Sequence, residues 1–350
     1  MSEHDADGPV DGIDVDGVTR WLQARTEVRP PLRFEVIQGG RSNLTYTVTD
    51  ADGRRRILRR PPLHGVLESA HDMGREHRIM SALAGSAVPV PTCVGYEPDP
   101  AITGAPFFVM EHVDGVVVRS AADGAALLEP PLRRAAAEDV VDVLVALHDV
   151  DIDAVGLGDL ARREGYIERQ LRRWHGQVEK ARTRDLPVLD EVHARLAANV
   201  PGQGPATIVH GDYRLDNLIL DPTTGRIQAV LDWELTTLGD PLADVGLLLV
   251  YWSEPGDPTI PLIDAPTVVE GFPRRAEIIE RYAKASGRDL GEIGYYVAFG
   301  YWKLACILEG VYGRYASGAY GDNDGSFEAF GDIVIALAEK AGEAAAEVGR

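Results

Sequence analysis

The sequence predicts an α+β fold in which a small β-rich region precedes a larger, mainly helical one. Short β-branched or alternating segments, separated by glycine turns, follow one another between residues 34 and 112. After the break at Val113-Asp114-Gly115, longer apolar patterns repeat at helical spacing. A length of 350 residues corresponds to about two domains. We therefore expect an acidic tail with a short helix over residues 1–30, an N-terminal lobe over 31–112 and a C-terminal lobe over 113–350.

The N-terminal region contains several short elements. A helix is expected around Trp21, ending before Pro30-Pro31, and Asp52-Gly53 is a favourable hairpin turn between two strands. The strands that we expect are 34–37, 44–49, 56–58, 92–96 and 107–112, with a helix over 70–83.

The C-terminal region is dominated by helices. Two short apolar strands, Thr207–His210 and Gln228–Leu231, flank a polar loop and a hairpin. The helices that we expect are 133–148, 166–182, 188–199, 277–286, 294–312 and 327–347.

Composition and charge exclude several classes of protein. With 35 basic and 55 acidic residues the net charge is −20, which disfavours nucleic-acid binding because affinity for phosphate backbones depends on clustered Lys and Arg. The apolar run Val245–Trp252 is far shorter than the ~20 residues of a membrane span. The acidic N-terminus does not resemble a secretory signal, and two cysteines suit a reduced cytoplasm. We expect a cytoplasmic protein that binds a small molecule; its oligomeric state is not predicted.

The polar loop carries the most informative motif. His210-Gly211-Asp212 is followed by Asn217, and Asp232 comes after the next strand. One carboxylate can orient an acceptor hydroxyl and take its proton, while an amide and a second carboxylate offer the oxygen ligands that Mg²⁺ prefers. An Asp-rich turn without chemistry is the alternative. The spacing favours metal-assisted phosphoryl transfer.

This motif resembles the aminoglycoside phosphotransferase family, over roughly residues 35 to 315. The resemblance implies a two-lobed protein-kinase-like fold and an ATP-dependent kinase, with GTP left open as the nucleotide. It implies that Asp212 is the catalytic base and that Asn217 and Asp232 bind Mg²⁺. It also implies that His210 supports the loop without reacting. Asp244, in Asp240-Pro241-Leu242-Ala243-Asp244, would brace this loop or favour a helix dipole.

The resemblance also implies a nucleotide site in the N-terminal region. A glycine turn would approach the phosphates, and Arg59 stands where kinases carry a phosphate-binding lysine, with Arg60 as the alternative. Glu76 would be its ion-pair partner, and the strand ending at His112 would hold adenine. Asp232-Trp233-Glu234 lacks the usual glycine, so a permanently formed metal site is expected. The nucleotide-binding residues predicted in this way are Gly39, Gly40, Ser42, Asn43, Arg59, Glu76, Met110, Glu111 and Val113.

The acceptor is less well defined. The strings at residues 58–62, 169–174 and 301–315 resemble the branch of the family whose kinase-like domain is fused to acyl-CoA dehydrogenases. That branch implies a hydroxy acid or hydroxyacyl-CoA-like acceptor, held by basic residues on two helices; surface ion pairs are the alternative. These tentative acceptor residues are Arg169, Arg173, Lys303 and Arg314.

Three alternative functions remain open at this point. One is an aminoglycoside phosphotransferase. Another is a catalytically weak nucleotide-binding protein, suggested by the missing strand lysine. The third is a metal-dependent hydrolase that uses Asp212, Asp232 and His210, although it leaves the glycine turn and Glu76 without a role.

Overall fold

The computed structural model describes residues 10–37, 43–63, 72–258, 264–316 and 328–348. The chain divides into two compact units. The first comprises residues up to Asp114 together with Gln228–Glu234, and the second comprises Gly115–Ile227 and Leu235 onwards. Segment 228–234 thus packs with the first unit although it follows the polar loop in the sequence. In the described residues, no helix combines the length and apolarity needed to cross a membrane.

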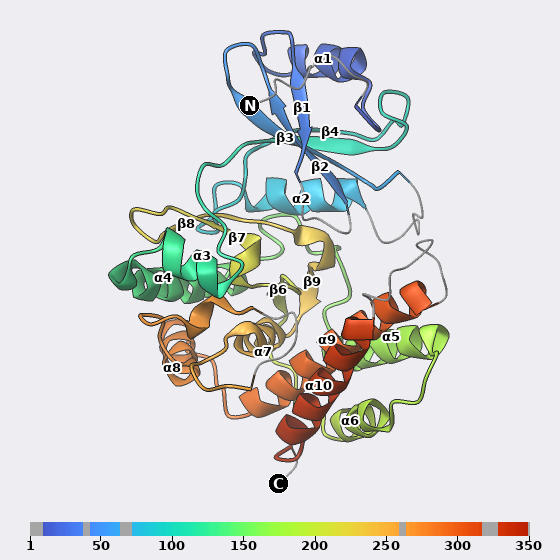
Figure 1. Ribbon diagram of the computed structural model, residues 1–350, viewed down its shortest axis with the longest axis vertical. Coiled ribbons are helices and arrows are strands. Elements are labelled where there is room, and N and C mark those ends of the chain that lie inside the picture. Colours follow the sequence, from blue (N-terminus) through green and yellow to red (C-terminus); the bar gives the residue numbers. More distant parts are fainter. Residues whose placement is uncertain (1–9, 38–42, 64–71, 259–263, 317–327, 349–350) are drawn as a thin grey trace. The chain divides into compact units, whose positions relative to one another are not determined.

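The first unit is built on a five-stranded antiparallel sheet in the order β1-β2-β3-β5-β4 (Figure 1). The turn at Asp52-Gly53 joins β2 to β3, and Asp50 accepts backbone hydrogen bonds from Asp52 and Arg54 across it. The elements are α1 (Val15–Gln23), β1 (Arg33–Val36), β2 (Leu44–Thr49), β3 (Arg55–Arg60), α2 (Met73–Leu83), β4 (Cys93–Glu97) and β5 (Phe107–Glu111), and most of β8 (Ile227–Val230) and of the 3₁₀ turn Trp233–Leu235.

Two helices pack on this sheet and bury apolar faces. Trp21 of α1 meets Phe107 of β5 edge-on, with ring centroids 5.1 Å apart. Helix α2 contacts β4 and β5 and is capped by Asp72, whose side chain accepts a hydrogen bond from the Arg75 backbone. On α2 the charged Glu76 is buried, whereas His77 is only half-buried.

The second unit is mainly helical, with short strands that carry the polar loop. Helix α9 is its centre and contacts α5, α6, α7 and α10 (Figure 1). The elements are α3 (Ala121–Leu127), α4 (Pro130–His148), α5 (Tyr166–Ala181), α6 (Pro187–Ala198), β6 (Thr207–Val209), a 3₁₀ turn (Leu215–Asn217), β7 (Leu218–Leu220), β9 (Thr237–Gly239), α7 (Leu242–Tyr251), a 3₁₀ turn (Pro266–Val268), α8 (Arg275–Ser286), α9 (Ile293–Ala316) and α10 (Glu328–Ala345).

Two helices of this unit were not expected from the sequence. Helix α3 is short, and its start depends on a capping box between Ser120 and Asp123. Helix α7 has almost no polar face, because it is buried on all sides, so the usual amphipathic pattern is missing. Gly246 of α7 allows the backbone of Tyr296 on α9 to approach closely, since an added Cβ would lie 2.4 Å from the Tyr296 carbonyl oxygen.

Candidate active site

The polar loop begins where β6 ends, and its backbone is held by a buried carboxylate. Gly211 has a φ of +86°, and an added Cβ would lie 2.8 Å from the Leu235 carbonyl oxygen, so glycine is required here. Asp244, at the start of α7, accepts hydrogen bonds from the backbone N–H groups of His210 (2.6 Å) and Gly211 (2.8 Å). Asp244 therefore braces the loop.

Asp212 projects from this braced loop. Its carboxylate accepts a hydrogen bond from the Asn217 side-chain amide at 2.9 Å, and the same amide donates to the Asp212 carbonyl oxygen at 2.8 Å. The Nε atom of Arg214 lies 3.4 Å from the same carboxylate oxygen. The Asp212 side chain is 23% exposed to solvent, so an incoming molecule can reach it.

Buried polar groups support Asp244 from behind. His148 links the Tyr282 hydroxyl (2.7 Å) to the Asp244 carboxylate (3.3 Å), and all three residues are buried. Burial alone would raise the pKa of Asp244, but the hydrogen bond and charge of His148, with His210 and the Gly211 N–H, lower it. Asp244 is therefore ionised and keeps both loop hydrogen bonds. His210 accepts a hydrogen bond from the Asp212 backbone at 3.2 Å, which is a supporting contact.

Lys303 is buried and also holds the backbone of the catalytic loop. Its ammonium group donates to the Gly211 carbonyl oxygen at 2.8 Å and lies 5.9 Å from the centroid of the Trp174 ring. Burial lowers the pKa of Lys303, against the opposing effects of Asp212 and Asp244. The side chain that the sequence suggested for the acceptor is thus engaged with the catalytic loop.

The other basic residues suggested for the acceptor lie at different depths. Arg169 is half-buried and donates to the backbone carbonyls of Arg162 and Glu164. Arg173 is exposed, with its guanidinium 4.9 Å from the centroid of the Trp174 ring, and Arg314 is exposed in the last turn of α9.

The first unit contains a cluster of three carboxylates around one guanidinium. Arg59 of β3 lies 3.2 Å from Glu76, 2.8 Å from Asp232 and 3.6 Å from Glu234, and its side chain is only 15% exposed. Burial raises the pKa of Glu76 to about 8. The negative charges of Asp232 and Glu234 add to this rise, and the positive charge of Arg59 opposes it. Glu76 thus holds a proton more readily than an ordinary glutamate does.

Asn43 joins the same cluster. It is buried, and its amide lies 3.4 Å from Glu76 and 3.1 Å from Glu234, so it donates to carboxylates. The other predicted residues of the phosphate-binding turn, Gly39, Gly40 and Ser42, lie outside the described residues.

Asp232 has an unusual backbone. Its φ is +65°, and among the described residues it is the one non-glycine residue with a positive φ. Such conformations cost free energy and are concentrated at functional sites. The carboxylate of Asp232 and the amide oxygen of Asn217 are hard donors, which suit Mg²⁺. Each of these side chains, Asn217 of the second unit and Asp232 of the first, thus has a donor atom whose chemistry suits the predicted metal.

The remaining predicted nucleotide residues lie near the end of β5. Met110 is buried, while Glu111 and Val113 are half-buried, and the Glu111 carboxylate pairs with Arg56 at 3.2 Å. Arg60, the alternative to Arg59, is buried and donates to the Gly12 and Thr103 carbonyls. Its contacts are structural, which favours Arg59 for the phosphate role.

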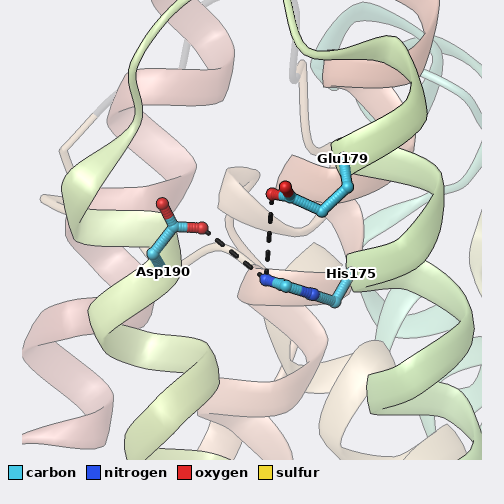
Figure 2. Close-up of side chains that lie close together, drawn as sticks. All are labelled: His175, Glu179 and Asp190. Atoms are coloured by element: carbon cyan, nitrogen blue, oxygen red, sulfur yellow. Dashed lines mark ion pairs between the residues drawn. The ribbon is translucent and has the colours of Figure 1, made fainter.

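A second group of titratable residues lies away from this loop. His175, Glu179 and Asp190, from α5 and α6, point toward one another (Figure 2). The guanidinium of Arg182 donates to both carboxylates. The two acidic groups of this cluster thus already share one internal cation.

Sequence reasoning missed several residues of the site. Glu234 was noted only as part of the Asp-Trp-Glu string, and neither His148 nor Tyr282 carried a signal. His148 closes the apolar helix α4 and Tyr282 lies on α8, so their meeting with Asp244 depends on tertiary packing. The one available signal for Glu234 was its spacing of two from Asp232.

Comparison with known proteins agrees with this geometry. The family model described as "Phosphotransferase enzyme family" matches residues 33–293. Acyl-CoA dehydrogenase family member 10 of Mus musculus is 36% identical over 313 residues, covering 87% of this chain and 29% of the relative. Family member 11 of Homo sapiens is 33% identical over 307 residues, covering 86% and 38%. The chain thus spans between 29% and 38% of the length of these relatives.

Solved structures confirm the expected α+β kinase-like fold. A candidate aminoglycoside phosphotransferase from Ralstonia eutropha is 31% identical, with a TM-score of 0.80, covering 96% of this chain and 99% of that one. An aminoglycoside-3'-phosphotransferase of type VIII has a TM-score of 0.59 at 19% identity, covering 85% and 98%, and shows the fold alone. The family resemblance of the sequence is therefore confirmed: the chain belongs to the phosphotransferase enzyme family.

Proposed function

We propose that this chain is an ATP-dependent small-molecule kinase that transfers a γ-phosphoryl group to a substrate hydroxyl. The observation that carries the proposal is the geometry of Asp212. It lies on a glycine turn held by Asp244 and Lys303, is oriented by Asn217 and is reachable from solvent. Positioning of this kind is the main contribution that a protein makes to phosphoryl transfer.

Each side chain of the site has one role in the proposed reaction. The acceptor hydroxyl donates its proton to the Asp212 carboxylate while its oxygen forms a bond to the γ-phosphorus. The bond between that phosphorus and the bridging β-phosphate oxygen breaks, and ADP leaves. Mg²⁺, when bound through Asn217 and Asp232, neutralises the charge on the phosphates. Arg59 contributes a fixed positive charge for the nucleotide, and Asn217 keeps the Asp212 carboxylate oriented.

The proposed acceptor is a hydroxy acid or a hydroxyacyl-CoA-like molecule. Support comes from the relatives, whose printed names are those of acyl-CoA dehydrogenase family members. Arg169, Arg173 and Arg314 remain proposed acceptor contacts on α5 and α9. A nucleotide is supported by solved structures of the same fold, one of which is a streptomycin–ATP complex of another phosphotransferase.

The test is an acceptor panel. Purified chain with Mg²⁺ and ATP is incubated with hydroxy acids, hydroxyacyl-CoAs or aminoglycosides, and ADP release is measured. We expect ADP that depends on a hydroxy acid or hydroxyacyl-CoA and is lost in Asp212→Asn. Asp185→Asn, which changes an exposed aspartate, is the matched control. ADP release only with aminoglycosides would overturn the acceptor, and the same release in Asp212→Asn would overturn the mechanism.

A further inference from the structure

A cavity of about 90 Å³ lies beside the catalytic loop, within the second unit. Arg214 and Asp216 of the loop line it, together with Leu248, Tyr251 and Trp252 from the end of α7 and the turn that follows it. At ~10–15 Å³ for each water-sized group, this volume holds roughly six to nine such groups. It therefore accommodates a short aliphatic chain.

The cavity is joined to the catalytic base through one guanidinium. Arg214 lies 3.0 Å from Asp216 and 3.4 Å from Asp212, with its plane over the Tyr251 ring at 4.7 Å. A molecule seated against Arg214 is thus one side chain away from the carboxylate that would take a hydroxyl proton. This inference rests on the proposed function, because it concerns the acceptor of that transfer.

The charges of the lining decide which acceptor is favoured. Two arginines and two aspartates line the cavity, but three of these groups are engaged. Asp216 pairs with Arg214, and Asp264 accepts a hydrogen bond from the Ala121 backbone at 3.1 Å. Arg119 is exposed and forms no ion pair with any carboxylate in the described part of the chain. An ammonium would have to compete with both arginines for Asp216, since the charge of Arg119 also acts on that carboxylate, whereas an anion can pair with the exposed guanidinium of Arg119.

We propose that this cavity binds the acceptor and that Arg119 selects acceptors with a carboxylate a few atoms from the reacting hydroxyl. The apolar part of the acceptor packs against Leu248 and Trp252, which are buried, and against Tyr251, which is half-buried. Arg119 and Arg172 are both exposed arginines of the second unit, but of the two only Arg119 lines the cavity. They are therefore a matched pair for a test.

The experiment measures binding and turnover separately. A series of short hydroxycarboxylates, with the corresponding hydroxyamides and amino alcohols, is titrated by calorimetry into wild type, Arg119→Gln and Arg172→Gln. Since hydrogen bonds to charged groups are the stronger ones, we expect Arg119→Gln to weaken carboxylate binding by about tenfold or more and to leave amide binding unchanged. Arg172→Gln should bind like wild type.

The possible results distinguish the assignment of the cavity from the proposed kinase function. Unchanged carboxylate binding in Arg119→Gln, an equal loss in Arg172→Gln, or a wild-type preference for amino alcohols would overturn the assignment of this cavity. ADP release is measured on the same samples. Binding that depends on Arg119 without acceptor-dependent ADP would keep the carboxylate site and overturn the proposed kinase function. If both proposals hold, Arg119→Gln lowers kcat/KM for the carboxylate and leaves the KM for ATP unchanged.

Discussion

The Nη2 atom of Arg59 donates a hydrogen bond to Oδ1 of Asp232 at 2.8 Å, so the proposed phosphate-binding and metal-binding side chains are partners of one another. Glu76 and Glu234 surround the same guanidinium. Arg59 is thus the counter-ion of three carboxylates in the protein without ligands. A bound divalent ion would assume part of this role.

Removal of Arg59 is expected to destabilise the first unit. Arg59→Met leaves three neighbouring carboxylates without a cation, and loss of one partner of a buried ion pair typically costs about 3 kcal/mol or more. Arg59→Lys keeps the charge and should recover part of this loss. Urea unfolding without nucleotide measures both variants. Equal stability of Arg59→Met and wild type would show that the cluster is not held by this charge.

Glu76 should make stability depend on pH. Its folded pKa of about 8 lies above its ordinary value of 4.5, so its contribution is fully present below pH 4.5 and is lost as the pH rises through about 8. Gln imitates the protonated carboxyl, so Glu76→Gln should gain stability over wild type between these limits. Urea midpoints at pH 5, 7 and 9, without divalent ions, measure the difference. Glu280→Gln, an exposed control, should follow wild type; parallel curves for all three would contradict the shift.

Asp232 should determine the metal requirement. Loss of supporting groups around a metal typically weakens affinity 10–100-fold, so Asp232→Asn is expected to raise the half-saturating Mg²⁺ concentration by about tenfold or more. Asp216→Asn should change it little, because Asp216 pairs with Arg214. ADP release at varied Mg²⁺ and fixed ATP is the measurement. Equal shifts in the two variants would mean that the wrong carboxylate has been assigned to the metal.

Asp244 should affect turnover as well as stability. Asp244→Asn weakens two backbone hydrogen bonds to the loop that positions Asp212, so we expect a loss of about 2 kcal/mol or more and a clear fall in kcat. The matched control is Asp50→Asn, since Asp50 is also buried and accepts two backbone hydrogen bonds, in the β2–β3 turn. The control should lose stability while kcat stays near wild type. A fall in kcat of the same size in both would reduce Asp244 to a general structural role.

Much of this structure could be predicted from local sequence. The β2–β3 hairpin has a strong turn signal at Asp52-Gly53, and the long helices have clear periodicity. The fold class and family also followed from the sequence, because the spacing of Asp212, Asn217 and Asp232 is specific. These features depend on neighbouring residues, which a sequence displays directly.

The rest depends on contacts between distant segments. Lys303 was assigned to the acceptor as one of the basic residues on two helices, whereas its ammonium group is buried against the Gly211 carbonyl. The cavity beside Arg214 is formed by residues from four separate stretches, so Arg119 had no signal in the sequence. The positive φ of Asp232 is likewise imposed by the surrounding fold.

The most direct test of the central claim follows the γ-phosphoryl group itself. ATP labelled in the γ-phosphate is mixed with an accepted hydroxy compound and either wild type or Asp212→Asn, and the label on the acceptor is counted. General-base catalysis contributes typically 10²–10⁴-fold, so Asp212→Asn should transfer label at least about a hundred times more slowly while binding ATP as wild type does. Label transferred at the wild-type rate by Asp212→Asn would contradict the account.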